Sequence, residues 1–154
     1  MKLKTVKVAL VTVFMGFAAS QAGTALAHNQ GGSFTTGLAA AIDYYQVTCS
    51  DDGNGVPSYL EAQVKDMTAN TSKVNIVIHK GTSCTTNKCA QFSMDTTDSD
   101  ALYSPLVRVT QGAGVYNLFV QHTAAGTDSY DVSFHCKTVS GVHTGTSVVA
   151  RQQQ

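Results

Sequence analysis

The sequence lacks the short motifs that mark the common catalytic sites. It contains no G-x-S-x-G nucleophile elbow, and no glycine-rich loop precedes a helical pattern as in phosphate-binding loops. Serine, histidine and aspartate are scattered along the chain, but no local context selects three of them as a catalytic triad. We therefore expect a protein that is not an enzyme.

Long apolar runs are also missing after residue 27, where no segment approaches the roughly 20 apolar residues that span a membrane. Before that point, Lys2, Lys4 and Lys7 precede the apolar run VALVTVFMGFAA, and the sequence ALA at 25–27 matches an A-x-A cleavage site. This pattern predicts a signal peptide over residues 1–27 and a mature chain that begins at His28. The expected location is periplasmic or extracellular, without membrane insertion.

Concentrated positive charge is the third feature that the chain lacks. The sequence has 10 Lys and Arg and 10 Asp and Glu. Loss of the three lysines in the predicted signal leaves 7 basic residues (10 − 3) against 10 acidic ones, a formal net charge of −3. Nucleic acids and anionic membrane surfaces attract clustered positive charge, so we expect neither as a partner.

What remains is the size of one domain, because the predicted mature chain has 127 residues (154 − 27). Residues 28–42 begin with HNQGGSFTTGL, rich in glycine, threonine and polar groups, which predicts a flexible arm that adds at most an edge strand near Phe34. Residues 43–150 are predicted as a single domain and residues 151–154 as a disordered tail.

Most of this domain shows the alternation of apolar and polar residues that is typical of β-strands. Clear examples are DYYQVTCS, YLEAQVKDM and KVNIVIHKG, and AQFSM, PLVRVTQ and TSVVA add weaker ones. Turn clusters such as SDDGNGVPS separate them, and helical periodicity is almost absent. The sequence therefore predicts an all-β, antiparallel, jelly-roll-like β-sandwich of seven or eight short strands. The predicted core-facing residues of the three clear strands are Tyr45, Val47, Cys49, Leu60, Ala62, Val64, Val74, Ile76 and Ile78.

The strongest pattern lies in GAGVYNLFVQHTAAGTDSYDVSFHCK, residues 112–137. Its first half places Tyr116, Leu118 and Val120 on one face, and its second half does the same with Tyr130, Val132, Phe134 and Cys136. A short connection of small residues joins the two halves. We interpret this segment as a β-hairpin with one face in the core.

All four cysteines lie in the predicted mature chain, which favours disulfides in an exported protein. Three pairings exist, and we prefer Cys49 with Cys136, because both lie on core-facing strand positions. Cys84 and Cys89 would then form a local bridge inside SCTTNKC. A zinc site is the competing interpretation, but CxxxxC with two isolated partners is poor zinc spacing.

Several of these segments together resemble the bacterial pre-peptidase C-terminal domain. The resemblance covers residues 43–136 and rests on YYQVTC, YLEAQVKD, VNIVIHKG and the closing G-x-Y-x-L-x-V and S-Y-x-V patterns. Such domains are small β-sandwiches appended to secreted proteases and other exported proteins. This chain departs from them where VNIVIHKG lacks the acidic Asp-x-Asp that commonly precedes an aliphatic strand. The resemblance implies a binding or accessory role and supplies no catalytic residue.

Metal binding is an alternative function. Cleavage before His28 would create a free α-amine beside an imidazole, a nitrogen pair that suits copper, and a second histidine would complete such a site. The candidates for it are His79, His122, His135 and His143.

Two acidic loops are candidates for calcium, which prefers clustered oxygen ligands: Asp51, Asp52 and Asn54 in one, and Asp95, Asp98 and Asp100 in the other. For His28 the competing interpretation is an ordinary residue after a cleavage site. For the two acidic loops it is turns whose side chains are solvated.

These observations lead to one expectation and one alternative. We expect an exported, non-catalytic β-sandwich protein that binds a protein or polymer ligand or has an accessory or structural role. The structural role includes self-assembly, in which the arm would add a strand to the sheet edge of a second copy, although we favour an arm that folds onto its own domain. The alternative is an exported protein that binds copper or calcium.

Overall fold

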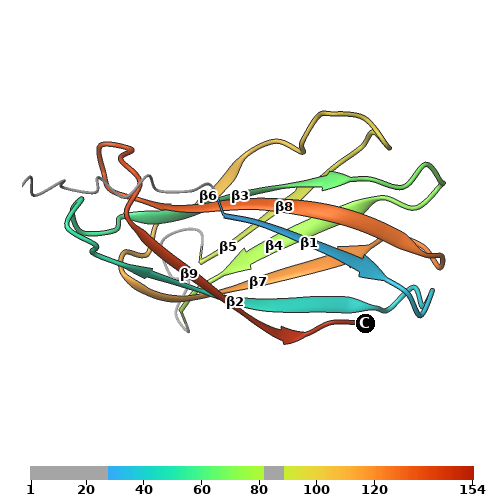
Figure 1. Ribbon diagram of the computed structural model, residues 1–154, viewed down its shortest axis with the longest axis horizontal. Coiled ribbons are helices and arrows are strands. Elements are labelled where there is room, and N and C mark those ends of the chain that lie inside the picture. The colour runs from blue at the N-terminus through green and yellow to red at the C-terminus, as the bar shows by residue number, and fades with distance from the viewer. Residues whose placement is uncertain (1–27, 82–88) are drawn as a thin grey trace, which may run out of the picture.

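The computed structural model describes residues 28–81 and 89–154, and within these ranges the chain forms nine β-strands and no helix. The strands form two antiparallel sheets that lie over one another as the two layers of a sandwich (Figure 1). The predicted all-β, antiparallel sandwich is thus confirmed, with more strands than the seven or eight expected. The predicted signal peptide, residues 1–27, lies outside the described residues.

Four strands form one sheet, in the order β1-β8-β3-β6. Five strands form the other, in the order β5-β4-β7-β2-β9. The bounds in chain order are β1 His28–Phe34, β2 Ile42–Ser50, β3 Tyr59–Asp66, β4 Val74–His79, β5 Ala90–Met94, β6 Val107–Val109, β7 Gly114–His122, β8 Asp128–Lys137 and β9 Gly145–Gln152. None of the described residues belongs to a helix long and apolar enough to cross a membrane.

Strands β7 and β8 do not pair with each other, so the predicted hairpin over residues 112–137 is wrong. Strand β7 lies between β4 and β2 in the five-stranded sheet, while β8 lies between β1 and β3 in the four-stranded sheet. The short connection, residues 123–127, therefore crosses from one layer to the other. Alternation identifies which side chains of a strand face the core, but the same pattern suits a hairpin or an arch between two sheets.

The core lies between the sheets and is formed by the predicted faces. All nine residues predicted to face inward from β2, β3 and β4 are buried, as are those predicted from β7 and β8. Phe34 at the end of β1 joins the same cluster. Burial of these apolar side chains is the main stabilising contribution to a sandwich of this kind.

Both ends of the described chain are more ordered than the sequence suggests. The predicted flexible arm contains β1, whose seven residues pair with β8 of the same chain, from His28 opposite Phe134 to Phe34 opposite Asp128. The favoured arrangement, an arm folded onto its own domain, is the one observed. At the other end β9 reaches Gln152, and the Gln154 main-chain nitrogen donates to Asp43 Oδ1 at 2.7 Å. Hydrogen bonds to residues far away in the sequence order both ends, and the composition of each end does not reveal these bonds.

The predicted disulfide between Cys49 and Cys136 is present, with 5.4 Å between the two Cα atoms. It joins the five-stranded sheet at β2 to the four-stranded sheet at β8. Cys89 is also disulfide-bonded, while its predicted partner Cys84 lies outside the described residues. A cross-link of this kind supports the expected oxidising environment, which is typical of exported proteins.

The inter-sheet disulfide should contribute more stability than the bridge to Cys89. Its cysteines are 87 residues apart. In the loop-entropy model, a cross-link that closes a loop of this length raises the free energy of the unfolded chain by about 4 to 5 kcal/mol. We expect Cys136→Ser to lower the midpoint of thermal unfolding far more than Cys89→Ser, as measured by circular dichroism. Equal losses in the two variants would contradict this ranking.

Candidate functional site

A row of apolar side chains crosses the outer face of the five-stranded sheet. Phe92 on β5 pairs with Val77 on β4, Val77 pairs with Phe119 on β7, and Phe119 pairs with Tyr44 on β2. The neighbours of Val77, Phe119 and Tyr44 along their strands are buried, so these side chains point away from the core, and Phe92 shares this outer face because it pairs with Val77. We call Phe92, Val77, Phe119 and Tyr44 the stripe. Phe92, at the edge of the sheet, is 55% exposed.

The aromatic half of the stripe is held in place by direct contacts. The rings of Tyr44 and Phe119 stack, with centroids 4.9 Å apart and planes inclined by 19°. A chain of hydrogen bonds then fixes the Tyr44 hydroxyl: Arg151 Nε donates to Gln46 Oε1 at 2.8 Å, Gln46 Nε2 donates to Tyr44 Oη at 2.8 Å, and Tyr44 Oη donates to Asn117 Oδ1 at 2.7 Å. The Tyr44 ring is therefore preorganised.

Uncharged amide side chains border the stripe on both sides. Asn117 pairs with Gln46 in the row on one side, and Asn75 pairs with Gln121 in the row on the other. Asn75 Oδ1 is buried and accepts no hydrogen bond from any described residue. No aspartate or glutamate occupies the outward positions of β2, β4, β5 and β7 in these rows. The face is thus apolar along its centre, with amides beside the stripe on β2, β4 and β7 and two apolar residues, Ala90 and Met94, beside Phe92 on β5.

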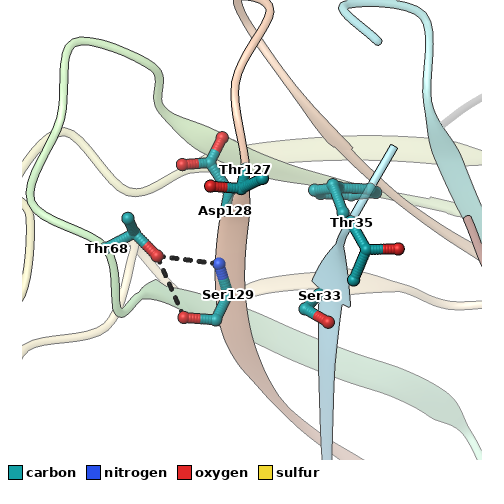
Figure 2. Close-up of a pocket in the computed structure, with 7 residues that line it drawn as sticks. Ser33, Thr35, Thr68, Thr127, Asp128 and Ser129 are labelled. Carbon is teal, nitrogen blue, oxygen red and sulfur yellow. Dashed lines mark hydrogen bonds between the residues drawn. The ribbon is translucent and has the colours of Figure 1, made fainter. Parts of the chain in front are cut away.

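A pocket of about 210 Å³ lies at one end of the four-stranded sheet (Figure 2). Phe34 and Asp128 contribute to its wall, and the other lining residues carry hydroxyls: Ser33, Thr35, Thr68, Thr127 and Ser129. Thr68 Oγ1 accepts from the Ser129 main-chain nitrogen at 2.8 Å and lies 2.9 Å from Ser129 Oγ. Since these groups already bond to one another, the pocket is a weaker candidate than the stripe.

His122, predicted as a candidate copper ligand, instead forms part of a buried hydrogen-bonded pair. Its Nδ1 lies 2.8 Å from Asp128 Oδ2 and its Nε2 lies 2.7 Å from the Leu38 carbonyl oxygen. Both the His122 and Asp128 side chains are fully buried. This bond spans the arch between β7 and β8. Burial raises the pKa of Asp128, but hydrogen bonds from Asn70, His122 and Ser72 outweigh burial and leave that pKa below its usual value.

A second buried polar group lies at Asp43, which the strand pattern places on the core face but which the sequence prediction passed over. Asp43 is fully buried and accepts from the Tyr130 hydroxyl, which lies 2.7 Å from the hydroxyl of Tyr45. Burial, together with these bonds, strongly raises the pKa of Tyr130. Burial likewise raises the pKa of Tyr45. These hydroxyls therefore stay protonated and serve as hydrogen-bond donors inside the core.

The first predicted calcium loop uses its oxygens internally. Asp51 Oδ1 accepts from the main-chain nitrogens of Gly53 and Gly55 at 2.8 and 3.1 Å. Asp52 Oδ1 accepts from the Asn54 nitrogen at 3.1 Å. These bonds are the turn chemistry that such side chains commonly provide. The competing interpretation of a structural turn describes all three residues.

The second acidic loop distributes its carboxylates among separate partners. Asp95 is buried, with Oδ2 accepting from the Asp66 main-chain nitrogen at 2.8 Å, while Asp98 forms an ion pair with Lys73. Asp100 Oδ1 accepts from the Leu102 nitrogen at 2.7 Å. Among the described residues, no three His, Cys, Asp or Glu side chains gather in a metal-binding group. The structure therefore does not bring the predicted calcium ligands together.

The remaining histidines are spread over both sheets and the segment between β8 and β9, where His143 lies. His79 is on β4, on the outer face of the five-stranded sheet beside Asn117. His135 on β8 contacts His143, with ring centroids 4.5 Å apart. His28 pairs through its main chain with Phe134, the residue next to His135 in sequence. The backbone thus places His28 near the His135 and His143 pair, whereas His79 and His122 are elsewhere.

The stripe was missed because its members come from four separated segments. Strand alternation assigns each residue to an outer face, yet only the order β5-β4-β7-β2 makes them neighbours. A local signal did exist, since Phe92, Phe119 and Tyr44 are aromatic residues at outward positions where polar side chains are usual.

Comparison with protein-family models, curated proteins and solved structures finds no significant match to this chain. The resemblance to the pre-peptidase C-terminal domain accordingly stays a prediction. An antiparallel β-sandwich serves many unrelated functions, so the fold alone does not define what this protein does.

Two buried carboxylates should affect stability with opposite pH dependence. The pKa of Asp128 is lowered in the folded protein, so its stabilisation is present above about pH 4 and is lost as pH falls through the lowered pKa. Burial raises the pKa of Asp66, whose Oδ2 has no hydrogen-bond partner among the described residues. Ionised Asp66 therefore costs stability at neutral pH, and this cost disappears as pH falls.

We therefore expect Asp128→Asn to be destabilising near neutral pH, with a deficit that shrinks in acid. Asp66→Asn should be as stable as the parent protein or more stable near neutral pH, with an advantage that shrinks in acid. Urea unfolding between about pH 3 and pH 7 measures both differences. Changes of the same sign in the two variants would show that the two carboxylates do not differ as described.

Proposed function

We propose that this chain is an exported, non-catalytic β-sandwich protein that binds a ligand through the stripe. The observation that carries the proposal is the continuous apolar row on a solvent-facing sheet surface, with Phe92 more than half exposed at its end. Exposed apolar surfaces rimmed by polar residues often mark interaction sites. The implied role of the resembled domain, binding or accessory work, agrees with this proposal.

Cross-strand apolar pairs also stabilise sheets, which is the competing explanation for the stripe. Phe119 and Tyr44 fit that explanation, because their rings stack on central strands. Phe92 fits it less well, because it lies on the edge strand β5 and is 55% exposed. A stabilising pair would gain from burial, whereas a binding surface requires exposure.

Non-catalytic function is supported by the positions of the ionisable groups in the core. His122 bonds to Asp128 and Asp43 accepts from Tyr130, and all four side chains are buried, although Asp128 also contributes to the wall of the pocket. Glu61, 3% exposed, lies 2.6 Å from Lys137 Nζ. These groups connect structural elements, and Asp128, which contributes to the pocket wall, is already bonded to His122 and Asn70.

The proposal predicts that loss of the Phe92 ring weakens binding without unfolding the protein. We expect the parent protein to be retained by at least one polymer in a panel of insoluble neutral glycans, acidic glycans and gelatin. Phe92→Ala should weaken that retention about tenfold or more, as for an aromatic residue central to binding. Val139→Ala is the matched control, because Val139 is apolar and 89% exposed but lies away from the stripe. Equal retention of both variants, or no retention of the parent, would contradict the proposal.

A second candidate function, copper binding at the predicted mature N-terminus, is favoured by one observation. The main chain of His28 lies opposite Phe134, and His135 contacts His143 at 4.5 Å. Cleavage before His28 would thus release an α-amine beside two histidines that already lie together. Imidazole and amine nitrogens are ligands that suit Cu(II).

This candidate predicts that copper affinity depends on the position of the N-terminus. An extra alanine before His28 should weaken Cu(II) binding sharply, because it displaces the α-amine from the chelate. His143→Ala should also weaken binding, while His79→Ala, on the other sheet, should not. Calorimetric titration with Cu(II) measures each variant, and elemental analysis of chelator-free protein gives the stoichiometry. Equal affinities of the extended and native forms would exclude the N-terminal site.

A further inference from the structure

We infer that the ligand of the stripe is a neutral polysaccharide, bound along the row from Phe92 to Tyr44. This inference rests on the proposed function and specifies its ligand. The stripe crosses four neighbouring strands, which lie about 4.8 Å apart, so it extends over about 14 Å. A surface of this length accommodates a short oligosaccharide segment and is too narrow for a large apolar partner.

The distribution of polarity across the stripe matches that of a sugar chain. A pyranose ring presents carbon-bound hydrogens on its faces and hydroxyls around its edge. Phe92 and the stacked pair of Phe119 and Tyr44 supply the apolar contact for such faces. The amides of Asn117 and Gln121, in the rows on either side, supply donors and acceptors for the hydroxyls.

The absence of charge along these rows favours a neutral ligand. In the rows beside the stripe, the outward positions of β2, β4, β5 and β7 carry four amides, His79 and three apolar residues, Ala90, Met94 and Ile42, with no carboxylate. Arg151 lies at the margin, where its Nε already donates to Gln46. A cationic peptide would find no acidic partner here, and an acidic glycan would find few basic ones. Binding should accordingly depend little on salt concentration.

The aromatic half of the stripe is preorganised for binding. The hydrogen bonds from Arg151 through Gln46 to Tyr44 hold the Tyr44 ring before any ligand arrives. Less side-chain entropy is then lost on binding.

The experiment compares three polymer classes by affinity gel electrophoresis: soluble neutral glycans (hydroxyethylcellulose, xylan and a mixed-linkage glucan), polygalacturonate as an acidic glycan, and gelatin as a protein. We expect at least one neutral glycan to retard the parent protein, with little change on addition of salt. Phe92→Ala should weaken this interaction about tenfold or more. Val139→Ala serves as the surface control, and circular dichroism confirms that each variant is folded.

Tyr44→Phe tests the role of the hydrogen-bond chain separately from the ring. It keeps the stacked ring but removes the bonds to Gln46 and Asn117, so we expect a smaller loss of neutral-glycan binding than Phe92→Ala causes. Retardation by polygalacturonate or gelatin that Phe92→Ala removes, without any by neutral glycans, would overturn the inference and leave the proposed function intact. No retardation that depends on Phe92 in any polymer would overturn both.

Discussion

Strand β8 holds the two sheets together through three of its side chains, and the rest of the fold depends on these connections. Asp128 bonds to His122 across the arch, Tyr130 donates to Asp43 on β2, and Cys136 is covalently bound to Cys49. Strand β8 is hydrogen-bonded to β1 on one side and to β3 on the other, so each connection also helps to fix the positions of these two strands. A buried polar bond costs desolvation, so it is stabilising only while its geometry is complete.

These inter-sheet connections also fix the outer sheet face that we propose as a binding surface. The inward residues of β2 and β7 are fixed by the core, so the outward ones, including Tyr44 and Phe119, hold constant positions relative to each other. A rigid scaffold lowers the entropy cost of binding. The C-terminal segment contributes as well, because Gln154 bonds to Asp43 and Arg151 bonds to Gln46.

Much of the fold could be predicted because its signals are local. Alternation at Tyr45, Val47 and Cys49 identifies the core-facing side of β2. The same alternation places Cys136 on the core-facing side of β8, and this shared orientation led to the correct disulfide. The pairing of β7 with β8 was wrong because both strands bury one face against the same core, whether they lie in one sheet or in two. The outward aromatic residues were a local signal, but the stripe as a continuous row could not be predicted, since only the strand order β5-β4-β7-β2 aligns Phe92 with Tyr44.

The sequence by itself determined which faces of most strands are buried, which cysteines share the core and how little helix the chain can form, because side-chain alternation and turn residues act over a few neighbouring positions. Tertiary structure alone decided which strands pair, that His28–Phe34 forms an edge strand, and that His122 is buried against Asp128. Pairing depends on contacts between residues far apart in the chain, and the free energy that selects one arrangement comes from the assembled core rather than from any segment.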